Sequence, residues 1–266
     1  MDARPNPVIF IHGLWIHTSA WQPWVDLFNA SGYDSSAPGW PGDGATVEDT
    51  RANSDSLNDV GIEDLFRHYA TIIEGLDETP VVIGHGFGGL VAQELLAKNL
   101  AVAAVAIDPL PIKGVRAVPY SQLKSTLPVL GNPKNKKRTV SLTARQFQYS
   151  FGNAIDEAES NELFEKWNIP GPGRPLFEDA TSALSRNSPA AVDTQTAVRG
   201  PLLLTAGLED HMVPPIVTQQ VFSLYRESSS RTDYRQFPGR GHSLTIDHGW
   251  QEVAQSTIDW LTEQGF

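Results

Sequence analysis

The chain of 266 residues contains no cysteine. Disulfide bonds, thiolate metal sites and a cysteine nucleophile are therefore excluded. Long apolar runs are missing as well, because no stretch approaches the ~18 residues that a membrane-spanning helix needs. The most continuous run, residues 100–107, is better explained as a buried strand. The N-terminal sequence MDARPNPVIFIHG has too short an apolar run for a secretory signal, so we expect a soluble, cytoplasmic protein.

Positive charge is scarce relative to negative charge. The formal net charge is −11 and the sequence pI is about 5.0. This balance disfavours nucleic-acid phosphates and anionic membrane surfaces as partners. One short basic run, residues 134–138, has no aromatic side chains interleaved with it and is interpreted as a solvated loop. The sequence therefore predicts no nucleic-acid partner and no membrane partner.

The sequence does contain enough apolar residues, 40% with seven tryptophans, to bury a substantial core. Short apolar runs alternate with amphipathic stretches, a pattern that is typical of βαβ units. Strands are predicted at residues 8–12, 33–37, 81–84, 101–107, 202–206 and 233–237, and helices at 62–76, 90–96 and 250–261. The predicted fold class is α/β, a mainly parallel sheet with helices on both faces.

The middle of the chain breaks this alternation. Residues 112–198 are rich in Pro, Gly, Ser and Asn, carry scattered aromatic residues, and have shorter helical patterns with no evident buried strand. We interpret this segment as a helical and loop cap over the sheet. The α/β core then consists of residues 1–111 and 199–266, and the whole chain forms a single compact unit.

The sequence VVIGHGFGGL at residues 81–90 predicts a buried strand that turns sharply into a helix. Many hydrolases place a nucleophilic serine at the centre of such a turn, in the pattern G-x-S-x-G. Here the glycines around the turn are present, but the central residue is Gly86. The sequence therefore predicts the turn that carries a nucleophile in such hydrolases, but Gly86 has no nucleophilic side chain.

Polar residues follow the ends of the other predicted strands. His12 follows the first strand, Asp108 the fourth, Asp210 the fifth and His242 the sixth. Because the carboxyl ends of parallel strands meet at one edge of a sheet, we expect these groups to gather there. His12 and His85 are interpreted as packed loop residues. The histidines without a motif are predicted to lie at the surface, namely His17, His68, His211 and His248.

Together these motifs resemble the α/β-hydrolase fold superfamily, in particular its small esterase- and lipase-like members. The resemblance spans nearly the whole chain: H-G-x-x early, G-x-x-x-G-G at the turn, G-x-x-D-x-x-V-P late and G-H near the end. The chain departs from the family pattern at the turn, where Gly86 stands in place of the serine.

The resemblance implies a role for each matching residue. Asp210 corresponds to the catalytic acid and His242 to the general base, with Asp108 as the alternative acid. The backbone N–H groups of Leu14 and Phe87 correspond to the oxyanion hole, which needs no particular side chain. Trp15, beside the oxyanion loop, is interpreted as part of the substrate-binding wall.

Three functions remain open at this level. In the first, the chain is a serine-hydrolase-type protein whose nucleophile is replaced by Gly86, which leaves a largely inactive, substrate-trapping site. In the second, it is a naturally serine-less lyase, epimerase or cyclase that uses His242 and Asp210. In the third, it is a non-catalytic binding protein. The expected ligand is a small, mostly apolar and neutral ester or lactone, or alternatively an amide. No metal or organic cofactor is implied, and the oligomeric state is left open.

Overall fold

The computed structural model describes residues 6–196 and 198–266. Within these residues, six strands form one sheet in the order β2-β1-β3-β4-β7-β8, and every neighbouring pair is parallel. The strands are β1 (Val8–Ile11), β2 (Ser35–Ser36), β3 (Val81–His85), β4 (Ala103–Ile107), β7 (Leu202–Gly207) and β8 (Thr232–Phe237). All six predicted strands are confirmed. The second is shorter than predicted, because only two of its residues pair with β1.

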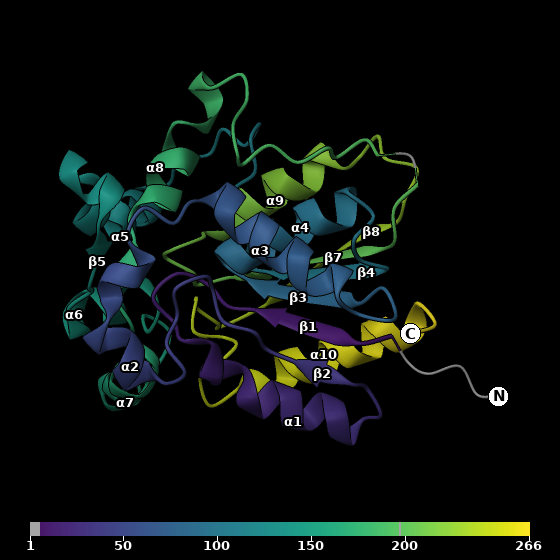
Figure 1. Cartoon of the computed structure of the whole chain (residues 1–266), viewed down its shortest axis with the longest axis horizontal. Coiled ribbons are helices and arrows are strands. Elements are labelled where there is room, and N and C mark those ends of the chain that lie inside the picture. Colours follow the sequence, from purple (N-terminus) through teal and green to yellow (C-terminus); the bar gives the residue numbers. More distant parts are fainter. Residues whose placement is uncertain (1–5, 197) are drawn as a thin grey trace.

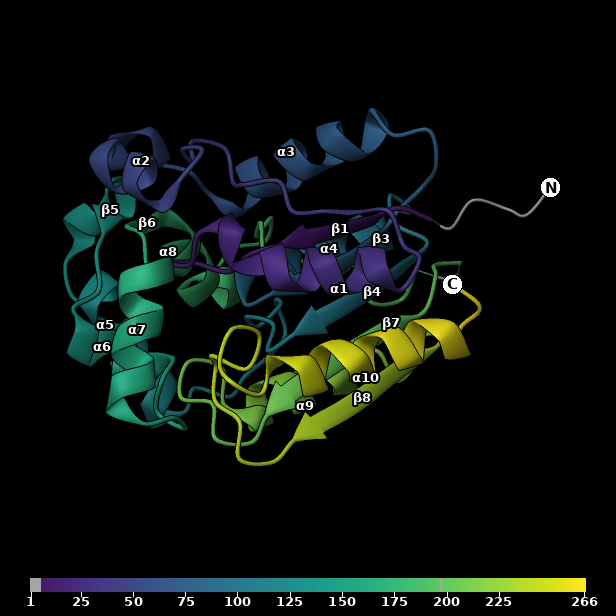
Figure 2. The same cartoon turned by 90° about the horizontal axis from the view of Figure 1, so that it is seen from below.

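Helices cover both faces of the sheet (Figures 1 and 2). The helices α3 (Ile62–Glu74), α4 (Phe87–Ala97) and α9 (Pro215–Leu224) lie on one face, and α1 (Gln22–Ala30) and α10 (Trp250–Glu263) lie on the other. Side chains of β1 alternate between two apolar clusters, Ile9 and Ile11 in one and Val8 and Phe10 in the other. This alternation is the period-two pattern of a strand that is buried on both faces. The predicted α/β fold class is confirmed.

The segment predicted as a cap contains four α-helices. These are α5 (Tyr120–Leu130), α6 (Ala144–Ser150), α7 (Glu157–Trp167) and α8 (Arg174–Ala180). Figures 1 and 2 place them at the end of the molecule toward which the strand arrows point, together with α2 (Val47–Ala52). Short 3₁₀ helices complete the described elements, at Thr18–Trp21, Ser54–Leu57, Pro133–Lys137 and Ser182–Leu184. The division of the chain at residues 112 and 198 stays a prediction.

Two details of the sequence analysis are corrected. The middle segment contains a short antiparallel strand pair, β5 (Thr139–Val140) with β6 (Gly171–Pro172), where no strand was expected. Two residues are too few to produce a recognisable alternation of polar and apolar side chains. His17, predicted at the surface, is buried, and its Nδ1 accepts the Ser19 N–H at the start of a 3₁₀ helix.

No helix among residues 6–196 and 198–266 is long and apolar enough to cross a bilayer. The first five residues, which belong to the N-terminal stretch examined for a leader sequence, lie outside the described residues.

Candidate active site

The turn between β3 and α4 has the geometry of a nucleophile elbow. Gly86 adopts φ +57° and ψ −118°, a conformation that glycine takes readily and other residues rarely adopt. A Cβ atom added to Gly86 would lie 3.5 Å from His242 Nε2 and 3.6 Å from both Gly13 Cα and Leu110 Cδ2. These are ordinary van der Waals distances. A serine side chain therefore fits the space at position 86, directly in front of the imidazole.

The flanking glycines are required by close packing. A Cβ on Gly84 would lie 2.0 Å from the Gly88 carbonyl oxygen, and a Cβ on Gly88 would lie 2.1 Å from the Ile11 carbonyl oxygen. Neither position can carry a side chain unless the backbone moves. These glycines let α4 begin close against β1 and β3, which holds residue 86 at the apex of the turn.

Two loops beyond late strands bring together an acid and a base. His242 Nδ1 lies 2.6 Å from Asp210 Oδ2. The other carboxylate oxygen of Asp210 accepts the backbone N–H groups of Met212 at 2.6 Å and Val213 at 2.8 Å. Both side chains are buried. The Asp210 carboxylate thus fixes the imidazole orientation, with Nε2 turned toward position 86, as a proton-transfer pair requires.

Asp108, the alternative acid, lies behind this pair. Its Oδ2 is 4.0 Å from His242 Nδ1, and its Oδ1 accepts the Gly207 N–H at 2.7 Å. Burial raises the pKa of Asp108 well above its ordinary value, and the nearby Asp210 carboxylate raises it further. Of the two carboxyls, Asp210 is the one at hydrogen-bond distance from the imidazole.

His85 is the second buried histidine beside the proposed base. Its ring centroid lies 4.3 Å from that of His242. Burial lowers the pKa of His85 well below its ordinary value, and the neighbouring His242 lowers it further. His85 stays neutral, as a packed residue of this turn.

Two backbone N–H groups are candidates for an oxyanion hole. Phe87 is the first residue of α4, so its N–H is among those without an acceptor inside the helix. Among the described residues, no acceptor pairs with the Leu14 N–H. Both residues line the same small cavity as Gly86 and His242. The assignment of these two N–H groups to an oxyanion hole stays a prediction.

The oxyanion loop is held in an uncommon backbone conformation. Trp15 adopts φ +68°, and its carbonyl accepts the Ile169 N–H at 2.9 Å and Asn168 Nδ2 at 3.1 Å. The Trp15 indole N–H donates to the Val140 carbonyl at 2.9 Å. Left-handed non-glycine residues cluster at functional sites, where the surrounding structure enforces the strain. Asp108, at φ +41°, is a second such residue at this site.

The cavity above Gly86 is very small. Its volume is about 10 Å³, near the ~10–15 Å³ that one water molecule needs on this measure. Its walls are mostly apolar, and the predicted substrate-binding residue Trp15 is among them. The lining residues are Leu14, Trp15, Gly86, Phe87, Leu110, Phe151, Leu176, Met212 and His242. A substrate larger than water therefore requires some of these lining side chains to move.

The sequence analysis did not single out Phe151, which closes this cavity from the cap side. Its ring packs edge-on against His242, with centroids 4.9 Å apart, and stacks on Phe147 at the same separation. Nothing in the local sequence marks Phe151, because tertiary packing alone brings α6 onto the sheet end. Leu110 and Met212, in contrast, follow Asp108 and Asp210 so closely that the strand-end pattern already places them nearby.

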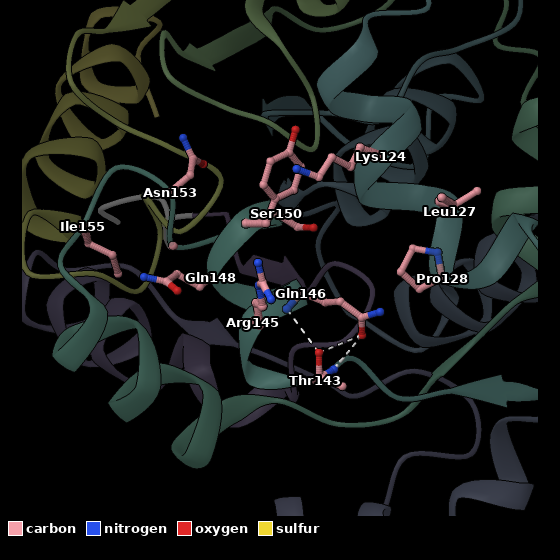
Figure 3. Close-up of a pocket in the computed structure, with 12 residues that line it drawn as sticks. Lys124, Leu127, Pro128, Thr143, Arg145, Gln146, Gln148, Ser150, Asn153 and Ile155 are labelled. Atoms are coloured by element: carbon pink, nitrogen blue, oxygen red, sulfur yellow. Dashed lines mark hydrogen bonds between the residues drawn. The ribbon is translucent and has the colours of Figure 1, made fainter.

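A much larger cavity lies on the other side of Phe151. Its volume is about 800 Å³, and its lining includes Ser150 and Gly152, the chain neighbours of Phe151. Figure 3 shows that its side chains come from α5, α6 and the loop after α6. The open cavity and the reactive position are thus separate in this structure.

One group of described residues has spacing suitable for a metal ion. Ligand atoms of His85, Asp108 and His242 all lie within 4.8 Å of one another. A metal on Nδ1 of His242 would have to displace the Asp210 carboxylate, which already accepts a 2.6 Å hydrogen bond there. The arrangement fits an acid–base pair better than a metal centre.

The chain belongs to the alpha/beta hydrolase family, whose model matches residues 8–256. The family resemblance inferred from the motifs is thereby confirmed. No curated protein sequence matches the chain significantly.

Solved structures similar to this chain include several hydrolases. A monoacylglycerol lipase from Paleococcus ferrophilus is 21% identical, with 97% of this chain and 96% of that chain covered and a TM-score of 0.67. An extracellular α/β-hydrolase from Paenibacillus is 21% identical, with 96% and 98% covered and a TM-score of 0.67. A methylesterase from Arabidopsis is 13% identical, with 97% and 99% covered and a TM-score of 0.66. Identities this low establish a shared fold, while the reaction has to be argued from the site.

Proposed function

We propose that this protein is a serine-hydrolase-type α/β-hydrolase whose nucleophile is replaced by Gly86. On this proposal it retains the groups that bind and polarise an ester or lactone and the pair that transfers protons. It lacks the hydroxyl that would attack the carbonyl carbon. It therefore holds its substrate and turns it over very slowly.

The observation that carries this proposal is the space in front of His242. A Cβ at position 86 would meet Nε2 at 3.5 Å without a clash, so a hydroxyl on that carbon falls within reach of a hydrogen bond of ~2.6–3.2 Å. Asp210 already orients the imidazole, and the N–H groups of Leu14 and Phe87 need no nucleophile to stay in place.

The substrate class follows from the walls of the small cavity. Apolar side chains surround the position where an acyl carbon would lie, and no described lining residue carries a formal charge when His242 is neutral. This supports a neutral acyl group at the reacting carbon. An ester or lactone suits such a site, because its carbonyl needs only the two backbone donors and the proton-transfer pair.

Restoring the hydroxyl tests the proposal. We expect Gly86→Ser to hydrolyse p-nitrophenyl acetate at least ~10³-fold faster than the native chain, since losing the serine of a comparable triad costs about 10⁶-fold in kcat. Gly86→Ala is the matched control, because it adds the same Cβ without the hydroxyl. The double variant G86S/H242A should return to the native rate. A folded Gly86→Ser protein no faster than Gly86→Ala would contradict the proposal.

A second function is supported by the cavity volume. The space of about 10 Å³ beside His242 can hold one water with up to three polar partners: the imidazole Nε2 and the N–H groups of Leu14 and Phe87. In that reaction His242 would take a proton from the water, which attacks the carbonyl directly. Turnover by the native chain that His242→Ala abolishes, without an acyl adduct in the intact mass, would favour this function over the first.

A further inference from the structure

Helix α5 exposes its apolar side chains and buries its polar ones. Tyr120, Leu123 and Leu127 are 78%, 49% and 62% exposed, and their spacing of three and four residues places them on one face. The opposite, buried face is formed mainly by polar residues, namely Gln122, Ser125 and Thr126, together with Val129. A surface helix normally shows the reverse pattern.

The inward polar face of α5 is satisfied by hydrogen bonds. Ser125 Oγ donates to the His211 carbonyl at 3.3 Å, and Thr126 Oγ1 donates to the Gln122 carbonyl at 3.0 Å. His211 directly follows Asp210, so α5 is attached to the loop that carries the proposed acid. These contacts fix which face of α5 points inward. Packing against the rest of the chain therefore does not explain why the outer face is apolar.

The chain segment that contains α5 carries charge of one sign only. Residues 112–155 contain no Asp or Glu and eight cationic residues, namely Lys113, Arg116, Lys124, Lys134, Lys136, Lys137, Arg138 and Arg145. Since the whole chain carries −11 and this segment +8, the rest of the chain carries −19. All of these cations except Lys113 are exposed, and among the described residues none of the eight pairs with a carboxylate.

The large cavity continues this surface between α5 and α6. Lys124, Leu127 and Pro128 enter it from α5, and Arg145 from α6 (Figure 3). Lys124 Nζ lies 3.8 Å from the centroid of the Tyr149 ring. The cavity lining thus includes both cationic and apolar side chains of α5 and α6.

We propose that the outer face of α5, with Tyr120, Leu123, Leu127 and the surrounding cations, docks on an anionic lipid surface. An apolar stripe rimmed by lysine and arginine is the pattern of an interfacial helix, which inserts shallowly between lipid headgroups. Each Lys or Arg near an anionic leaflet strengthens the attraction to it. The strongly acidic remainder of the chain is repelled by the same leaflet, which orients the cap toward it.

This inference differs from the expectation drawn from net charge. The total of −11 predicts no membrane partner, but it averages a cationic segment with a strongly acidic remainder. Within a Debye length of ~8 Å at physiological salt, an interface responds to the local charge. The local charge at α5 is positive.

Flotation with vesicles tests the proposal on the full chain. We expect the protein to float with phosphatidylcholine vesicles that contain phosphatidylglycerol, and far less with pure phosphatidylcholine vesicles. High salt should reduce flotation with the anionic vesicles. The double variants L123S/L127S and K136E/K137E should each lower the apparent affinity about tenfold or more. Ile216→Ser, which alters a 45% exposed residue on α9, and Arg226→Glu are the matched controls.

The outcomes separate the possible occupants. Absence of flotation with the anionic vesicles, or equal losses in the control variants, would overturn the proposal. A concentration-dependent dimer in sedimentation velocity, abolished by L123S/L127S without any lipid binding, would assign the face to a second copy of the chain instead. The readout is binding, so its outcome is independent of whether Gly86→Ser hydrolyses a soluble ester.

Discussion

The two halves of the candidate active site differ in completeness. On the elbow side, Gly86 and the tightly packed glycines shape the turn, and position 86 carries no side chain. On the acid–base side, Asp210 uses both oxygens in hydrogen bonds and holds His242. Backbone packing alone therefore sets the shape of the β3–α4 turn. The turn does not depend on a side chain at position 86.

The sharpest test of this comparison lies on the acid–base side, in the Gly86→Ser background. Asp210→Asn should lower kcat/KM for an aryl ester by about 10⁴-fold, as loss of the orienting carboxylate does in comparable triads. Asp108→Asn should cost far less, because Asp108 Oδ2 lies 4.0 Å from His242 Nδ1, beyond hydrogen-bond distance, whereas Asp210 Oδ2 lies 2.6 Å from it. An amide at 108 can still accept the Gly207 N–H. Equal losses for the two variants would show that the carboxyls act as one unit.

The next effect concerns α4, the helix that follows the elbow. Burial, and then the charge of Glu63, raise the pKa of Glu94 to about 7. Because this folded-state pKa exceeds the unfolded value, the folded protein binds more protons there, and stability falls as pH rises from ~4.5 through ~7. Glu94→Gln removes the penalty. Its gain in unfolding free energy over the native chain should grow by on the order of 3 kcal/mol between pH 5 and pH 8.

Urea unfolding of both proteins at the two pH values measures this difference. Lys98→Gln is a useful companion, because the charge of Lys98 lowers the pKa of Glu94 and its loss should widen the effect. If the native chain and Glu94→Gln lose or gain stability in parallel across this range, the buried carboxyl on α4 does not titrate there.

The smallest effect separates backbone strain from packing at the elbow. Gly86→Ala should lower the unfolding free energy by ~1–3 kcal/mol, because φ +57° is unfavourable for a residue with a Cβ. Gly239→Ala is the control, with φ +72° and nothing within 4 Å of its Cβ. Similar losses, measured by urea unfolding, would attribute the cost to the backbone. A much larger loss at position 86 would mean that the cavity cannot accept the carbon that a serine needs.

The parts of the site that lie on strand ends could be predicted from the sequence. Gly86, Asp210 and His242 occur in short motifs directly after buried strands, and a parallel sheet gathers such positions at one edge. The preference for Asp210 over Asp108 came from the family resemblance, and the structure places Asp210 at hydrogen-bond distance from the imidazole.

Features that depend on tertiary packing could not be predicted. Phe151 reaches His242 only because α6 folds over the sheet end, and no local pattern encodes that contact. His17 was predicted at the surface because it belongs to no motif. It is buried instead, and its ring accepts the Ser19 N–H at the start of the 3₁₀ helix that follows. The β5–β6 pair is too short to leave a periodic signal. The reversed polarity of α5 became meaningful only once its buried face was known.

The glycine at the apex of the elbow has a consequence for how such proteins are found. Reagents that label serine hydrolases form a covalent bond with an activated hydroxyl, and position 86 offers none. A proteome-wide survey with fluorophosphonate probes would pass over this chain, while its fold and its paired imidazole and carboxylate match those of the labelled proteins. If the N–H groups of Leu14 and Phe87 form the proposed oxyanion hole, reversible ligands that mimic a tetrahedral oxyanion should bind there, because they engage backbone donors and need no nucleophile.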